Sequence, residues 1–178
     1  MLFLCYTEHN ANTIGGFERS MYTIREMTKN DAKDYLSWRY PAPYEFYNIP
    51  KEFHEAELKE IMDNSANWFC VEKSGSGMIG FYEYTPRKNG AVEIGLGLRP
   101  DYTGKGYGLA FVKGCIAFGK QRLGTDCISF VLRVAEFNQR AIKTYQRAGF
   151  QHYGRVRAMA RIKASGEPVS FLCMKLSA

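Results

Sequence analysis

Polar and apolar residues first alternate regularly at 22–27, where Tyr-Thr-Ile-Arg-Glu-Met is typical of a half-buried strand. The residues before this stretch show neither a periodicity nor a helix cap. We therefore expect one domain over 21–178, beginning near Met21, with an N-terminal extension over 1–20 in front of it. No repeat and no linker divides the sequence further.

Two helices and a loop are expected next. Asn30 and Asp31 are good helix-start residues, and apolar residues follow at three-residue spacing, which predicts a helix that ends near Tyr40. A second apolar face predicts a helix over 51–64. Three prolines in 41–50 exclude a regular helix, so this segment is predicted to be an aromatic-rich loop.

Short apolar runs then predict three strands, over 68–72, 78–84 and 91–98. The Asn89-Gly90 pair separates the last two and is a strong hairpin signal. These three strands are therefore expected to form an antiparallel meander.

Helices and strands alternate in the second half of the sequence. A helix over 106–123 and a nearly continuous apolar strand over 127–134 predict a strand-helix-strand crossover. Another helix is expected to begin at Asn138 and to end where Gly149 favours a left-handed cap. The last elements are strands over 151–162 and 168–176, with a turn around Ser165-Gly166. The order of elements predicts an α/β (α+β) fold with about seven strands and about four helices.

Composition supports a globular protein. The chain has 178 residues, 46% hydrophobic and 24% charged, and its apolar runs fall far short of the roughly 20 residues that span a bilayer. Its N-terminus lacks the basic region of a signal peptide, and its five scattered cysteines contain no Cys-x-x-Cys pair. We expect a cytoplasmic protein with reduced thiols and no membrane partner.

Charge and histidine content say less about which ligands or partners the protein binds. None of the three histidines lies near a cysteine at ligand spacing, so no metal is expected. The net charge of +6 leaves open a nucleic-acid partner, a polyanionic cofactor or a solvated surface. Because the late basic residues are interleaved with apolar ones, we favour a solvated face, then phosphate attraction, and expect no nucleic acid. These basic residues are Lys143, Arg147, Arg155, Arg157, Arg161 and Lys163.

Candidate chemistry begins at 102–108, where Gly104, Gly106 and Gly108 occupy every second position between a strand and a helix. Backbone N–H groups of such a loop can converge on one point, and the helix that follows adds about half a positive charge there. The segment indicates a phosphate-binding loop, although it fits neither the Rossmann nor the Walker pattern. The alternative is an ordinary flexible turn.

The preceding strand contains Gly95 and Gly97, and glycine inside a strand often marks a bulge or a close approach to the backbone. An extended ligand could lie along this strand and end in a pyrophosphate on the glycine loop. That description fits the pantetheine arm and diphosphate of coenzyme A.

Two motifs in this order resemble the GNAT family of N-acetyltransferases. The loop at 103–108 resembles the family's Gln/Arg-x-x-Gly-x-Gly/Ala motif, and Asn-x-Arg-Ala-Ile-x-x-Tyr-x-x-Ala-Gly-Phe at 138–150 resembles its second motif. The resemblance covers 21–176, with Thr103 standing where the family usually has Gln or Arg. It implies the GNAT fold, whose mixed central sheet is splayed at the cofactor site, and acetyl-CoA as cosubstrate.

The resemblance also implies the cofactor-binding residues. The backbone of Leu96, Gly97 and Leu98 would pair with pantetheine, and Asn138 would contact the same arm. The diphosphate would lie on the loop formed by Thr103, Gly104, Lys105, Gly106, Tyr107 and Gly108.

The family mechanism is a direct attack of a neutral amine on the thioester, without an acyl-enzyme, and Tyr145 would face the sulfur. A tyrosine pKa near 10 lies about 1.5 units above that of a thiol, so proton transfer to the thiolate would be uphill by roughly 2 kcal/mol. Tyr145 is therefore better described as a hydrogen-bond donor to the departing thiolate. From its helical spacing alone, Tyr145 would be interpreted as a core aromatic residue on the apolar face of its helix, and only the motif favours a catalytic role.

A base or a desolvating pocket is expected for an alkyl amine. At pH 7 its neutralisation costs about 4.6 kcal/mol, against roughly 1.4 kcal/mol for an α-amine. Glu93 resembles an acidic position that some family members carry as Glu-Ile-Gly, and it could accept the proton through water. The alternative for Glu93 is a solvent-facing strand carboxylate, and Glu83 and Glu136 are weaker candidates.

The acceptor is expected to be a primary amine of a small molecule. In the family the first interhelical loop covers the acceptor pocket, and here an aromatic set could form its walls. The candidate residues are Trp38, Tyr40, Tyr44, Phe46 and Tyr47. Core packing is the alternative for them, and a protein N-terminus as acceptor, a non-catalytic acetyl-CoA-binding module and a homodimer remain open.

Overall fold

The computed structural model describes residues 22–159 and 168–177. The extension expected over 1–20 and the turn around Ser165-Gly166 lie outside these residues, as do Met21 and the last three positions of the strand expected over 151–162. The described elements are β1 (Tyr22–Glu26), α1 (Lys29–Ser37), α2 (His54–Asp63), β2 (Trp68–Lys73), β3 (Gly77–Pro86), β4 (Ala91–Leu98), α3 (Gly108–Leu123), β5 (Ser129–Ala135), α4 (Gln139–Arg147), β6 (Gln151–Met159) and β7 (Pro168–Ser177).

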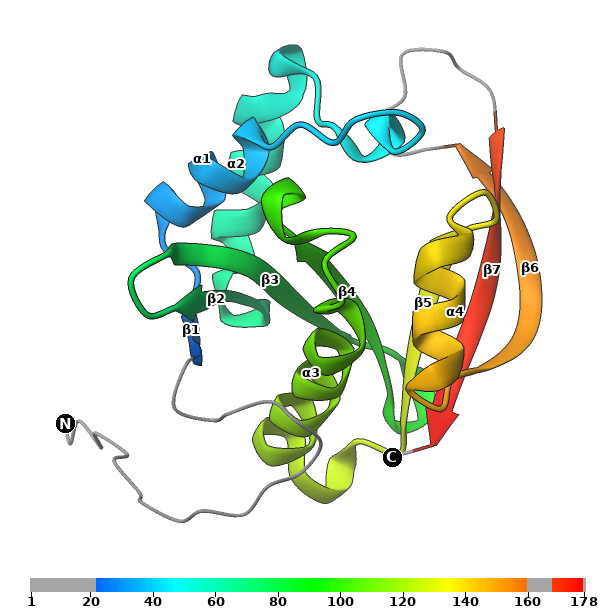
Figure 1. Cartoon of the computed structure of the whole chain (residues 1–178). Helices are drawn as coiled ribbons and strands as arrows, with labels where there is room; N and C mark the ends of the chain where they lie inside the picture. Colours follow the sequence, from blue (N-terminus) through cyan, green and yellow to red (C-terminus); the bar gives the residue numbers. More distant parts are fainter. Residues whose placement is uncertain (1–21, 160–167, 178) are drawn as a thin grey trace, which may run out of the picture.

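The strands form one mixed sheet in the order β1-β2-β3-β4-β5-β7-β6. The meander of β2, β3 and β4 is antiparallel, and the crossover through α3 makes β4 and β5 parallel, which confirms both predictions. β4 and β5 pair only over Ala91–Glu93 and Ser129–Val131. Beyond these residues the two strands diverge (Figure 1), so the sheet is splayed as the family resemblance implied.

Local chemistry explains two boundaries that differ from the prediction. α1 begins before Asn30 because Thr28 forms a capping box: the Asp31 N–H donates to Thr28 Oγ1 at 3.3 Å and the Thr28 N–H donates to Asp31 Oδ2 at 2.8 Å. α3 begins at Gly108 rather than at 106, because Gly106 has a φ of 86°, which a right-handed helix excludes.

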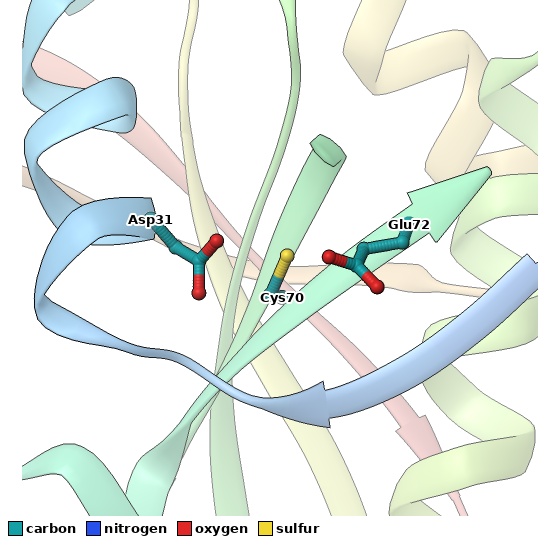
Figure 2. A group of neighbouring side chains, drawn as sticks. All are labelled: Asp31, Cys70 and Glu72. Atoms are coloured by element: carbon teal, nitrogen blue, oxygen red, sulfur yellow. The ribbon is translucent and has the colours of Figure 1, made fainter. Parts of the chain in front are cut away.

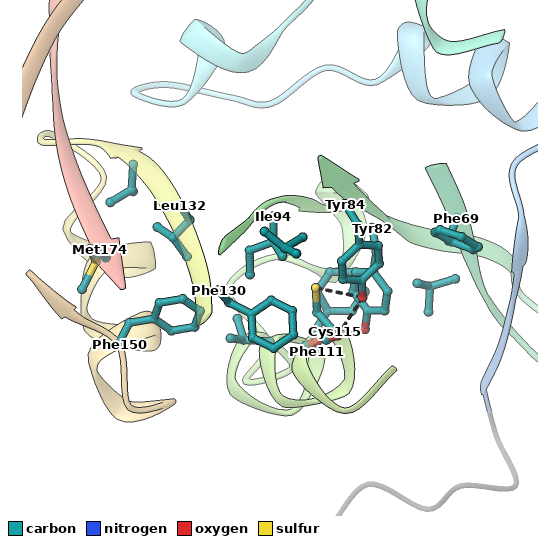
Figure 3. Close-up of a cluster of buried hydrophobic side chains, with 14 of the residues drawn as sticks. Phe69, Tyr82, Tyr84, Ile94, Phe111, Cys115, Phe130, Leu132, Phe150 and Met174 are labelled. Carbon is teal, nitrogen blue, oxygen red and sulfur yellow. Dashed lines mark hydrogen bonds between the residues drawn. The ribbon is translucent and has the colours of Figure 1, made fainter. Parts of the chain in front are cut away.

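A large hydrophobic core lies between the sheet and helices α3 and α4 (Figure 3). Phe111 and Cys115 of α3 pack on strand residues such as Phe130. Two buried tyrosines of β3 satisfy their hydroxyls on α3, because Tyr82 donates to the Phe111 carbonyl at 2.9 Å and Tyr84 to the Cys115 carbonyl at 2.7 Å. These bonds fix α3 over β3.

A second core lies on the opposite face of the sheet, under α1 and α2. It joins Leu36 of α1 and Ile61 of α2 to Cys70 and Phe81 of the strands. Alternate residues of β3 therefore belong to different cores, Phe81 to this one and Tyr82 to the other. In the described part of the chain, no helix combines the length and the apolar composition needed to cross a bilayer.

Candidate functional site

A cavity of about 680 Å³ opens where β4 and β5 part. Phe81 and Tyr35 line it from the side of α1 and α2, whereas Phe111 and Val112 line it from the side of α3. The cavity is therefore lined from both sides of the sheet, at the split between the two strands. Other lining residues are Ile94, Gly95, Leu96, Gly97, Leu98, Leu132, Arg133 and Val134.

The glycine loop lies at the mouth of this cavity. Gly104, Gly106 and Gly108 line it, and a Cβ on Gly106 would meet nothing within 4 Å, so the backbone is open there. No side chain caps the first turn of α3, which leaves its N–H groups without a side-chain acceptor. Lys105 and Tyr107, both expected in the loop, are not among the residues that line the cavity.

Thr103 stands at the first loop position, where the family usually has Gln or Arg, and Arg140 lies close to the loop in the fold. The Thr103 hydroxyl donates to the Pro100 carbonyl at 2.8 Å and so closes the turn before the loop. Arg140 of α4, quoted in the second motif without a role, lines the cavity with its Nη1 3.6 Å from the position of a Gly104 Cβ. A guanidinium thus lies beside the loop although Thr103 supplies no long side chain. The Arg140 guanidinium also lies 4.5 Å from the ring centre of Tyr44.

Two of the late basic residues, Arg147 and Arg155, have different surroundings. Arg147 lines the cavity with Arg140, which favours the phosphate-attraction alternative for this part of the charge. Arg155 instead forms an exposed ion pair with Glu136, with 2.6 Å between Nε and Oε1. Arg161 and Lys163 lie outside the described residues.

Asn138 lines the cavity, but both polar atoms of its side-chain amide form hydrogen bonds within the protein. Its Oδ1 accepts from the Ala141 N–H at 3.1 Å and caps α4, as the prediction of a helix start required. Its Nδ2 donates to the Tyr47 hydroxyl at 3.0 Å. Asn138 therefore ties α4 to the aromatic loop between α1 and α2.

Tyr145 lies in the wall of the cavity and packs edge-to-face on Phe150, with 5.9 Å between ring centres. Its hydroxyl has no hydrogen-bond partner within the described residues. Burial raises the pKa of Tyr145 above its ordinary value, so the hydroxyl stays protonated at neutral pH. The hydroxyl can therefore serve as a hydrogen-bond donor.

The aromatic residues expected at the acceptor site are divided by the structure. Tyr40, Tyr44 and Tyr47 line the cavity. Trp38 does not, because its ring is buried between Tyr35 and Phe81 in the second core; here the core-packing alternative holds. Phe46 also stays outside the cavity and packs on Tyr47, Phe137 and Phe171. The sequence pattern missed Tyr35, which lines the cavity.

Tyr40 fixes the aromatic loop to the end of β4. Its hydroxyl donates to the Leu98 carbonyl at 2.8 Å, and burial raises its pKa, so this donor persists at neutral pH. The loop is therefore attached on both sides of the split, through Tyr40 to β4 and through Tyr47 to α4.

The bulge that Gly95 and Gly97 could have marked is absent, whereas both glycines line the cavity where an extended ligand was expected. The register of β3 and β4 is regular, with Glu83 opposite Gly95 and Phe81 opposite Gly97. A Cβ on Gly97 would lie 2.6 Å from the Phe81 ring, and one on Gly95 would lie 2.6 Å from Glu83 Oε2. Side chains of β3 therefore fill the space that these glycines leave on one face of β4.

Glu93 is held by two arginines. Its Oε2 accepts from Arg87 Nη2 at 2.7 Å and its Oε1 accepts from Arg133 Nε at 2.9 Å. Glu93 does not line the large cavity but a second pocket of about 310 Å³, together with Glu83 and Thr85. The sequence did not predict these ion pairs. They occupy both oxygens of the carboxylate that was expected to act as the base.

One group of potential metal ligands occurs in the described residues, Asp31, Cys70 and Glu72, whose ligand atoms lie within 4.8 Å of one another (Figure 2). Arg25 of β1 donates to Asp31 Oδ2 at 2.6 Å and also to Glu72. A guanidinium therefore balances these carboxylates, and burial raises the pKa of the Cys70 thiol to about 12. The group fits a structural ion-pair network.

Comparison with known proteins adds a family and a set of folds. The family model of the acetyltransferase (GNAT) domain matches residues 22–151. An uncharacterized N-acetyltransferase of Methanocaldococcus jannaschii is 28% identical over 151 residues, which are 79% of this chain and 66% of that protein, slightly under two thirds of its length.

Among solved structures, that of a spermidine N-acetyltransferase of Vibrio cholerae with CoA and spermine is similar. It has a TM-score of 0.63 and 22% identity, with 89% of this chain and 96% of that chain covered. A GNAT-family acetyltransferase of Bacillus anthracis has a TM-score of 0.66 and 14% identity, with 88% and 95% covered. At such identities these structures establish a common fold.

Proposed function

This chain belongs to the GNAT family of acetyltransferases, and on that premise we propose that it transfers the acetyl group of acetyl-CoA directly to a primary amine of a small molecule. The observation that carries the proposal is the cavity at the split between β4 and β5, with open glycine backbone at its mouth and Tyr145 in its wall. Acetyl-CoA supplies the activated acetyl group.

The chain offers suitable donors for each part of acetyl-CoA. The backbone of Leu96–Leu98 has no strand partner on the side of β5, so it can pair with the amides of pantetheine. The glycine loop and the uncapped first turn of α3 offer N–H groups to the diphosphate. Arg140 and Arg147 add positive charge in the same cavity.

Direct transfer is favoured because the buried thiols are poor nucleophiles. Burial raises the pKa of Cys115 to about 12, as it does for Cys70, so both remain protonated at neutral pH. Neither is among the residues that line the cavity. Tyr145 then donates a hydrogen bond to the sulfur as the carbon–sulfur bond breaks.

The acceptor would enter beneath the aromatic loop. Tyr40, Tyr44 and Tyr47 offer ring faces and edges in the cavity, which suit the apolar part of a modest-sized amine. The similar Vibrio cholerae protein is a spermidine N-acetyltransferase, so spermidine belongs among the acceptors to be tried.

Thiol release from acetyl-CoA, with product masses measured, tests the proposal. The panel contains spermidine, 2-phenylethylamine, L-phenylalanine and a peptide with a free N-terminus. We expect acetylated product with at least one of the three small amines and faster thiol release than without amine. Acetylation of the peptide alone would instead indicate an N-terminal acetyltransferase, and acetyl-CoA binding without any acetylated product a binding module.

A further inference from the structure

The second pocket lies on the face of the sheet that carries α1 and α2. Phe81 of β3 belongs to the core under these helices, and Glu83 and Thr85 follow it at two-residue intervals, so they share its face. Their cross-strand partners Gly95 and Glu93 lie on the same face. The pocket is thus on the side of the sheet away from α3.

The two cavities have a common wall where β4 and β5 part. Ile94, Gly95 and Arg133 line both of them. Pairing between the strands ends one residue earlier, at Glu93 and Val131. The second pocket therefore adjoins the large cavity at the split.

Glu83 is the carboxylate of this pocket that forms no ion pair among the described residues. Its Oε1 accepts from Thr85 Oγ1 at 3.1 Å, and its Oε2 lies over Gly95. Burial raises the pKa of the Glu83 carboxyl, the Thr85 hydrogen bond partly offsets this, and the nearby Glu93 raises it again. The charged groups facing Glu83 are Glu93 of β4, Arg87 before it, Arg133 of β5 and Glu57 of α2.

The ion pairs of Glu93 indicate a structural role for this residue. It joins Arg87, which follows β3, to Arg133 of β5, at the last paired position of β4. Both Glu93 carboxylate oxygens already accept hydrogen bonds from guanidinium groups, Oε2 from Arg87 and Oε1 from Arg133. Glu93 is therefore a positioning residue that fixes the start of the split.

We propose that Glu83, on β3, is the group that receives the proton of the acceptor amine, and that Glu93 serves only to hold the strands around it. This inference rests on the proposed function. It assigns a catalytic role to a residue outside both sequence motifs.

The reaction balances with Glu83 as base. The ammonium of the acceptor gives one proton to the Glu83 carboxylate, and the neutral nitrogen attacks the thioester carbonyl carbon. A carbon–nitrogen bond forms and the carbon–sulfur bond breaks, with its electron pair going to sulfur. The nitrogen's second proton goes to the thiolate, which leaves as coenzyme A, and Glu83 returns its proton to solvent through the second pocket. A carboxyl with a raised pKa is better matched to this proton than an ordinary one.

The test is Glu83→Gln, measured with whichever amine of the panel above the wild-type chain acetylates fastest. We expect kcat/KM for the amine to fall by about 100-fold or more at pH 7, as for loss of a general base, with the Kd of acetyl-CoA changed less than about twofold. The wild-type rate should rise as the pH passes the Glu83 pKa. In the variant this rise is lost and the rate follows the amine's own deprotonation, so the deficit narrows toward pH 10.

Two variants separate catalysis from folding. Gly95→Ala keeps the carboxylate but places a methyl group 2.6 Å from Oε2, so it should displace Glu83 and reproduce much of the loss. Glu55→Gln removes an exposed carboxylate of α2 and should change nothing. Thermal unfolding checks that all variants fold.

Each outcome decides the question. If the wild type acetylates an amine and Glu83→Gln keeps kcat/KM within about threefold with an unchanged pH profile, Glu83 is not the base. An equal deficit at every pH would make its role structural and overturn the assignment. If the wild type acetylates no amine, the proposed function fails first and takes this inference with it.

Discussion

At the level of single residues, burial determines what Tyr145 can do. A raised pKa keeps the hydroxyl protonated, the residue lines the cavity, and the hydroxyl has no hydrogen-bond partner among the described residues. A thiolate that forms during the reaction would provide an acceptor for this hydroxyl. The sequence motif and ordinary pKa values already favoured a donor over an acid, and the raised pKa in the fold points the same way.

We therefore expect Tyr145→Phe to lower kcat by about 10- to 100-fold, the worth of one hydrogen bond to a charged group. The Kd of acetyl-CoA should stay nearly the same, because the bond forms only as the thiolate leaves. Steady-state rates and calorimetric titration measure the two quantities. An unaltered kcat would remove Tyr145 from the mechanism.

At the level of elements, the shape of the glycine loop depends on backbone conformations that other residues avoid. Gly106 has a φ of 86° and is open to the cavity. Gly106→Val adds backbone strain of about 1–2 kcal/mol and puts a side chain where the diphosphate is expected. We predict that acetyl-CoA binding is lost, as measured by calorimetric titration.

Gly75 provides the matched control for the loop. Its φ is 74°, and a Cβ there also meets nothing within 4 Å, but it lies in the turn between β2 and β3 and does not line the cavity. Gly75→Val should therefore show similar backbone strain with acetyl-CoA binding retained. Equal loss in both variants would mean that strain alone is responsible.

Helix α1 depends on Asp31 for its start and for its attachment to β1. Burial alone would raise the pKa of Asp31, but hydrogen bonds from Arg25 and Thr28 outweigh it and lower the pKa to about 2, from an ordinary value of 3.8. Because the folded pKa is the lower one, this stabilisation is fully present above about pH 4 and is lost as the pH falls toward 2.

Asp31→Asn should lower the free energy of unfolding by about 1 kcal/mol at pH 7, a typical cost of losing a helix cap. The difference from wild type should vanish between about pH 4 and pH 2, where the wild-type carboxylate is protonated. Denaturant unfolding at several pH values measures this. Asp63→Asn, at an exposed end of α2, should show a much smaller difference at neutral pH.

At the level of the whole molecule, the sequence predicted the order of elements better than the surroundings of single side chains. The meander and the crossover depend on local patterns, and the structure confirms both. Trp38, by contrast, was expected at the acceptor site and lies in the second core. Its position in the sequence could not show which neighbours bury its ring.

The two glutamates show the same limit at longer range. Glu93 was identified from a local motif, but its partner Arg133 is 40 residues away, so the ion pair could not be read from the sequence. The position of Glu83 over Gly95 depends on the register between β3 and β4, which only the folded sheet determines.

The attachment of the aromatic loop on both sides of the split has a thermodynamic consequence. Tyr40 holds it to the Leu98 carbonyl, beside the backbone expected to bind pantetheine, and Tyr47 holds it to Asn138. Any shift of β4 or α4 on binding one ligand therefore changes the free energy of the loop that covers the other. Linkage makes any such effect reciprocal: if acetyl-CoA changes the affinity for the amine, the amine changes the affinity for acetyl-CoA by the same factor.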